Sequence, residues 1–153
     1  MTNVRRATAA DADELVRLRG LLLATMGADL SDDRWRQAAL GLLRARLDEP
    51  DPTLVAFVVD RPGGLAACVV GAVDHRLGGP GGSTGRAGYV YNVVTEPEHR
   101  RRGHSRRCMA ALLDWYREND VSAVDLRASP EGEPLYAALG FVRTRDPAMR
   151  LRF

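Results

Sequence analysis

The chain has 153 residues, of which 45% are hydrophobic and 27% are charged, and its formal net charge is +2. This length and composition predict a single globular domain over residues 1–153. No stretch approaches the roughly 18 apolar residues that a membrane span needs, and residues 1–14 lack the apolar part of a signal peptide. We therefore expect a cytoplasmic protein without a membrane partner, with Cys68 and Cys108 as reduced thiols in its core.

All 22 basic residues are arginines, because the sequence contains no lysine. This absence excludes a Walker A phosphate loop, which needs its lysine, and any Schiff-base lysine. His75, His99 and His104 lack the spacing of metal ligands, so no metal is expected.

The first third of the chain predicts a strand followed by two helices. The strand is expected at residues 3–8, and Thr8 and Asp11 have the spacing of a capping box. Ser31 is the expected N-cap of the second helix, which ends before Pro50. The apolar faces of the two helices are Leu15, Leu18, Leu22 and Met26, and then Trp35, Ala39, Leu42 and Leu43.

The remainder alternates strands and helices. Strands are expected at residues 54–59, 65–75, 86–95 and 121–127, helices at about 103–118 and 131–139, and a terminal strand or hairpin from Phe141 onward. The glycine-rich segment 78–85 cannot hold regular structure and is expected to be a flexible connection. The element order β-α-α-β-β-β-α-β-α-β predicts a mixed α/β fold.

The segment 93–107, V-V-T-E-P-E-H-R-R-R-G-H-S-R-R, is the most informative one. A β-branched run ends there, passes through three arginines and Gly103, and opens a helical pattern. Unpaired amides at such a helix N-terminus, together with the helix dipole, favour binding of a phosphate.

Two motifs support a resemblance to a known family. Residues 100–105, R-R-R-G-H-S, resemble the acyl-CoA pyrophosphate loop of the GCN5-related N-acetyltransferases (GNAT), except that Ser105 stands where Gly or Ala is expected. Residues 126–141, L-R-A-S-P-E-G-E-P-L-Y-A-A-L-G-F, resemble the family's C-terminal signature. The resemblance covers essentially the whole chain and implies a mostly antiparallel sheet flanked by helices.

The resemblance also implies the cofactor and the residues that hold it. Acetyl-CoA is the expected co-substrate, with its diphosphate on the amides of residues 101–105 and its pantetheine arm along the strand that ends at Thr95, which is expected to splay from its neighbour. Ser129 is expected either to cap a helix or to touch the pantetheine. The expected cofactor-binding residues are Val93, Val94, Thr95, Arg100, Arg101, Arg102, Gly103, His104, Ser105, Ser129 and Leu135.

The implied reaction is direct attack of an amine on the thioester in a ternary complex. Tyr136 occupies the family position whose hydroxyl protonates the leaving thiolate. The base is open, because the fourth strand offers no carboxylate; ordered water near Asn92 or Tyr89 is favoured over Glu96, Asp74 and His75. An amine with a low pKa would need no dedicated base.

Two other functions compete with this interpretation. A catalytically degenerate family member would bind acyl-CoA as a sensor, which the missing carboxylate motivates. A nucleic-acid-binding module is disfavoured by the small net charge and the lack of interleaved aromatic residues, so no nucleic-acid partner is expected. The acceptor is expected to be a small-molecule or peptide amine, and family members are often homodimers. Asp29, Asp32 and Asp33 are a candidate attraction for a cationic amine.

Overall fold

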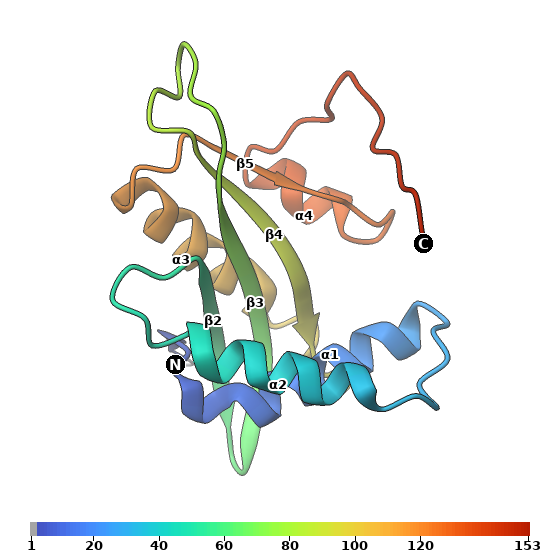
Figure 1. Cartoon of the computed structure of the whole chain (residues 1–153). Coiled ribbons are helices and arrows are strands. Elements are labelled where there is room, and N and C mark those ends of the chain that lie inside the picture. The colour runs from blue at the N-terminus through green and yellow to red at the C-terminus, as the bar shows by residue number, and fades with distance from the viewer. Residues whose placement is uncertain (1–2) are drawn as a thin grey trace.

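A five-stranded mixed sheet runs through the computed structural model, which describes residues 3–153 (Figure 1). Neighbouring strands are antiparallel except β4 and β5, which are parallel. This architecture confirms the predicted mixed, mostly antiparallel α/β fold. The strands lie in chain order across the sheet: β1 (Val4–Arg6), β2 (Leu54–Arg61), β3 (Gly64–His75), β4 (Arg86–Thr95) and β5 (Ala123–Leu126).

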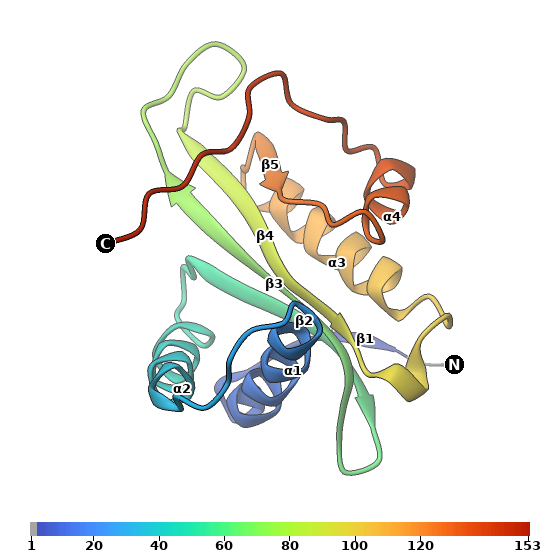
Figure 2. The same cartoon turned by 90° about the vertical axis from the view of Figure 1, so that its right-hand side faces the viewer.

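Helices cover both faces of the sheet (Figure 2). One face packs against α1 (Ala12–Thr25) and α2 (Arg34–Arg46), and the other against α3 (His104–Glu118). The short helix α4 (Glu133–Ala138) follows β5, and two 3-10 turns, η1 (Ala9–Asp11) and η2 (Pro97–His99), precede α1 and α3. The apolar faces bury two clusters, one on each side of the sheet.

Two glycines allow α3 to approach the sheet closely. A Cβ at Gly71 would lie 2.4 Å from the Tyr116 hydroxyl, and one at Gly88 would lie 2.8 Å from its ring carbon Cζ. The buried hydroxyl of Tyr116 donates to the carbonyl oxygens of Ala72, at 2.8 Å, and Tyr89, at 3.3 Å. Tyr116 therefore fixes α3 over the centre of β3 and β4.

The strand β4 separates from β5 halfway along its length. Pairing runs from Ala87 with Ala123 to Val90 with Leu126 and, in the described residues, ends there. The register between β3 and β4 also shifts beside Asn92, whose φ of 60° lies in the left-handed region. The predicted splay is confirmed: the last part of β4 keeps its pairing to β3 only.

Three local expectations are wrong. Ser31 is not an N-cap, because α2 begins at Arg34, whose amide donates to Asp32 Oδ1. Met26 is 72% exposed because it follows the last residue of α1. No strand follows α4: residues 141–153 are irregular, and Pro147 removes one backbone donor from this segment.

Other expectations hold. Asp11 Oδ2 accepts the Thr8 amide at 2.8 Å, as expected of a capping box. Cys68 and Cys108 are buried free thiols, and burial raises the pKa of Cys108 to about 12. The segment 78–85 holds no strand or helix beyond one isolated bridge between Gly79 and Gly82. Within residues 3–153, no helix is long and apolar enough to cross a membrane.

Candidate active site

A cavity of about 570 Å³ opens where β4 separates from β5. Its walls are the end of β4, the turn that begins α3, the segment that leads into α4, and one side of α1. Ten of the eleven predicted cofactor-binding residues line it, together with the predicted acid Tyr136: Val93, Val94, Thr95, Arg100, Arg101, Gly103, His104, Ser105, Ser129 and Leu135. The eleventh, Arg102, does not.

The turn before α3 presents a run of unpaired amides. Arg101 and Gly103 have φ values of 62° and 75°, so the backbone alternates through left-handed conformations. Within the part of the chain that the structure describes, the N–H groups of residues 101–106 have no hydrogen-bond partner. Such a concave run at a helix N-terminus is suited to an anion with several oxygens.

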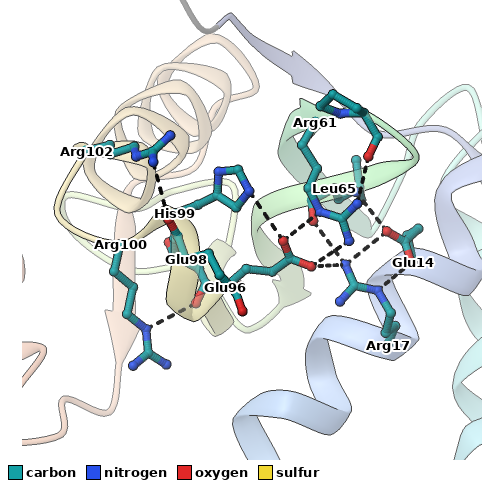
Figure 3. A network of polar contacts seen from close by, with 11 residues as sticks. Glu14, Arg17, Arg61, Leu65, Glu96, Glu98, His99, Arg100 and Arg102 are labelled. Atoms are coloured by element: carbon teal, nitrogen blue, oxygen red, sulfur yellow. Dashed lines mark hydrogen bonds and ion pairs between the residues drawn. The ribbon is translucent and has the colours of Figure 1, made fainter.

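The turn is held between β4 and α3 by side chains. The hydroxyl groups of Thr95 and Ser105 lie 2.8 Å apart, and Arg100 Nε donates to the Thr95 carbonyl oxygen. Arg102 Nη2 donates to the Glu98 carbonyl oxygen (Figure 3), and Arg102 does not line the cavity. Arg100 and Arg101 are thus the arginines of the R-R-R run that face the cavity.

His104 is the first residue of α3 and is buried at the cavity wall. Its Nδ1 lies 2.7 Å from Arg107 Nη2, a distance that suits an acceptor nitrogen in a neutral imidazole. Burial, followed by the nearby Arg107 charge, lowers the pKa of His104. The free protein therefore keeps this side chain neutral at pH 7.

Tyr136 projects from α4 into the cavity. Its ring packs edge-on against Phe141 at 6.1 Å, and its hydroxyl has no hydrogen bond to any described protein group. Burial raises the pKa of Tyr136, so the hydroxyl keeps its proton at neutral pH. The side chain can therefore donate a proton within the cavity. Ser129 Oγ accepts the Gly132 amide at 3.1 Å in the turn before α4, whose N-cap is Gly132, and Ser129 also lines the cavity.

The two residues predicted to order water lie elsewhere. Asn92 is buried and faces a second cavity, of about 180 Å³, between β4 and the helices α1 and α2. Its Oδ1 accepts Arg19 Nη1 at 3.1 Å. Tyr89 lines neither cavity, and its ring lies 6.4 Å from that of Tyr91. Asn92 and Tyr89 therefore lie outside the cavity that Tyr136 lines.

Glu96 is engaged in a buried ion network (Figure 3). Its carboxylate lies 2.6 Å from Arg61 Nε and 2.7 Å from Arg17 Nη2, and the Arg61 guanidinium contributes most to holding its pKa below the usual range. Glu14 extends the network by accepting the Leu65 amide. A carboxylate stabilised in this way is a poor base, so Glu96 anchors η2 to α1 and β2.

The remaining base candidates are surface residues. Asp74 is paired with Arg76 at 3.0 Å, and His75 Nε2 lies 3.4 Å from Arg86 Nη1. Both residues are exposed and line neither cavity. In residues 3–153, no group of three His, Cys, Asp or Glu side chains is arranged to hold a metal.

Sequence reasoning missed part of the wall. Leu22 belongs to the predicted apolar face of α1, and the helical period gives no sign that one end of this face lines a cavity. Arg19, on the same helix, interrupts the apolar face of α1, and this charged residue was the sign in the sequence of the second cavity, which it lines. The missed residues of the large cavity are Leu21, Leu22, Thr25, His99, Arg106, Glu131 and Gly132.

Comparison with known proteins agrees with this geometry. The model of the acetyltransferase (GNAT) family matches residues 17–141. No curated protein matches the sequence at a significant level. Among solved structures, a predicted acetyltransferase with acetyl-CoA from Clostridium acetobutylicum is 26% identical, with a TM-score of 0.87 and coverage of 99% of this chain and 96% of that one.

Two further structures have the same fold. A GCN5-related N-acetyltransferase from Ralstonia eutropha JMP134 is 22% identical, with a TM-score of 0.81 and 99% coverage of both chains. Glucosamine-6-phosphate N-acetyltransferase from Arabidopsis thaliana is 17% identical, with a TM-score of 0.75 and coverage of 99% of this chain and 98% of that one.

Proposed function

The chain belongs to the acetyltransferase (GNAT) family, and from this premise we propose that it transfers an acetyl group from acetyl-CoA to a primary amine. The observation that carries the proposal is the run of unpaired amides at residues 101–106, which opens into the same cavity as the free end of β4 and Tyr136. We assign residues 1–153 to one catalytic domain.

The amides of residues 101–106 hold the diphosphate of the coenzyme. Each favourable charge contact with the α3 dipole contributes about 0.3–1 kcal/mol, and Arg100 and Arg101 add positive charge at the rim. Gly103 permits the left-handed turn and close approach of the phosphate. The neutral imidazole of His104 can donate from Nε2 toward the same anion.

The free edge of β4 holds the pantetheine arm. Val93, Val94 and Thr95 lack a partner strand on the side of β5, so their backbone groups are available to the amide groups of the arm. A β4 amide also donates to the thioester oxygen as negative charge develops there. Cofactor binding is further supported by the similar Clostridium acetobutylicum structure, which contains acetyl-CoA.

Transfer proceeds by direct attack in a ternary complex. The amine nitrogen bonds to the carbonyl carbon, the C–S bond breaks, and Tyr136 gives its proton to the departing thiolate. The proton of the amine leaves through ordered water near Asn92 or Tyr89. Among residues 3–153, Glu131 is the one carboxylate that lines the large cavity, and it is exposed to solvent. Tyr136 regains its proton from solvent, so the cycle is balanced.

The competing function is a sensor that binds acetyl-CoA without transferring the acetyl group. A thiol-release assay over amino acids, polyamines, aminoglycosides and peptide N-termini separates the two. Release of CoA that depends on one class of amine, with loss of turnover in Tyr136→Phe, supports the enzyme. Coenzyme binding without release for any amine supports the sensor.

We also propose a homodimer. The C-terminal segment carries several apolar side chains that are largely exposed in the single chain, and we propose that the partner subunit covers them. These residues are Val142, Met149, Leu151 and Phe153.

A further inference from the structure

The cavity of about 180 Å³ on the α1 and α2 side of β4 has one charged lining residue, Arg19. Its Nη1 donates to Asn92 Oδ1 at 3.1 Å, and no carboxylate of the described chain forms an ion pair with it. Most of the other arginines near the protein interior are neutralised; Arg17 and Arg61, for example, share Glu96. A half-buried guanidinium with free N–H groups is arranged to bind an anion.

The rest of the cavity wall is apolar, apart from the amide of Asn92 and the hydroxyl of Tyr91. No hydrogen bond within residues 3–153 involves that hydroxyl, and burial raises the pKa of Tyr91. An engineered cavity of about 150 Å³ holds benzene, so 180 Å³ suits one medium-sized apolar group. The apolar lining residues are Leu15, Val16, Ala39, Leu42, Leu43, Leu54 and Val70.

The strand β4 connects this small cavity to the proposed reaction centre. Tyr91 and Asn92 line the small cavity, and the next residues along the strand, Val93 and Val94, line the cofactor cavity. A molecule bound to Arg19 therefore lies one or two residues along β4 from the backbone that would hold the thioester. This juxtaposition suits a small acceptor whose amine is close to its anionic group.

We propose that the acceptor is an apolar α-amino acid, whose carboxylate binds Arg19 and whose side chain fills the small cavity; this inference rests on the proposed acetyltransferase function. A carboxylate accepts two parallel hydrogen bonds from a guanidinium and is smaller than a phosphate. Burial beside Arg19 lowers the pKa of the amine, which supplies the neutral nucleophile without a carboxylate base.

The same wall disfavours polycationic acceptors. A second ammonium group would lose its hydration beside Arg19 without gaining a negative partner. Asp29, Asp32 and Asp33 do not compensate, because they line neither cavity and bind the Ser31 amide, Arg34 and Arg36 respectively.

Initial rates of thiol release at saturating acetyl-CoA test the inference in the wild-type protein. L-Leucine, L-leucinamide and 3-methylbutylamine share one apolar body, and only the first has a carboxylate. We expect kcat/KM for leucine to exceed that for each of the others by about 10- to 100-fold, the worth of a charged hydrogen-bonded pair. Equal or better turnover of leucinamide overturns the inference, and so does faster turnover of the aminophosphonate analogue of leucine.

Variants of Arg19 provide a second test of the inference. Arg19→Gln is expected to remove the preference for leucine over leucinamide, mainly through KM, while calorimetric binding of acetyl-CoA is unchanged. Arg19→Lys retains part of the preference because it keeps the charge. Arg117→Gln is the matched control, since Arg117 is exposed on α3 and paired with Asp114. Retention of the full preference in Arg19→Gln contradicts the inference.

The two proposals fail in different ways. If the protein does not bind acetyl-CoA, or if no amine gives thiol release, both the acetyltransferase function and the inference are wrong. If amines without a carboxylate or polycationic amines give thiol release and α-amino acids give none, only the inference is wrong.

Discussion

The hydroxyl groups of Thr95 and Ser105 lie 2.8 Å apart and join the last residue of β4 to the first turn of α3. This bond closes the loop that contains η2 and the R-R-R-G turn. The two elements it joins belong to the rigid sheet and its packed helix, so the unpaired amides are fixed in place before a ligand arrives. Such preorganisation reduces the entropy lost on binding.

Gly103→Ala tests the turn. The φ of 75° disfavours a side chain by about 1–2 kcal/mol, and a Cβ would lie 3.1 Å from Arg107 Nη1. We expect affinity for CoA, measured by calorimetry, to fall about 5- to 10-fold. Gly27→Ala is the control, because Gly27 has a similar φ of 76° with open space around it and lies outside both cavities. A loss of affinity in the control as large as in Gly103→Ala would contradict this prediction.

Tyr136→Phe tests the proposed acid. Removing the hydroxyl is expected to lower kcat about 100-fold or more, with little change in calorimetric affinity for acetyl-CoA. Because burial raises the pKa of Tyr136, wild-type kcat should rise from pH 7 to 9 as the amine loses its proton and fall only above pH 10. The variant should lack the alkaline fall. An unchanged kcat would assign Tyr136 to packing alone.

Glu96→Gln tests the ion network. Glu96 is 5% exposed and bound by two arginines, so neutralising it should lower the free energy of unfolding by about 2 kcal/mol. The pKa of Glu96 is lowered in the folded state, so its stabilisation is complete above the unfolded value of 4.5 and is lost as pH falls through the folded value. Denaturant titrations at pH 7 and pH 3 should differ less in the variant than in the wild type. The exposed pair of Glu133 and Arg143 provides a control, since Glu133→Gln should leave stability nearly unchanged.

Removal of residues 148–153 tests the homodimer. This deletion takes away Met149, Leu151 and Phe153, which are all largely exposed in the single chain. Sedimentation velocity should show a dimer for the full chain and a monomer for the truncated one. A full-length monomer at micromolar concentration would refute the proposed assembly.

The loop and its helix were predictable because their signals are local. A β-branched run, Gly103 and the periodic residues of α3 specify the turn by backbone chemistry that depends little on distant contacts. The same is true of the position of Tyr136 in α4. The sequence therefore predicted eleven of the residues that line the large cavity, Tyr136 included.

The features that escaped prediction depend on tertiary contacts. The alternating pattern at the C-terminus resembles a strand, but residues 141–153 pair with no strand within the described chain. The burial of Glu96 depends on Arg17 and Arg61, which are distant in sequence. Similarly, the direction in which Asn92 faces follows from a register shift between β3 and β4 that no periodicity reveals.

The most direct measurement compares CoA with pantetheine, which has the same arm without the 3′-phosphoadenosine diphosphate, by calorimetry on the unmodified chain. If the amides of residues 101–106 bind the diphosphate, CoA should bind at least about 100-fold more tightly than pantetheine, with the charge-assisted hydrogen bonds making most of the difference. Equal affinities, or no heat with CoA, would contradict the account.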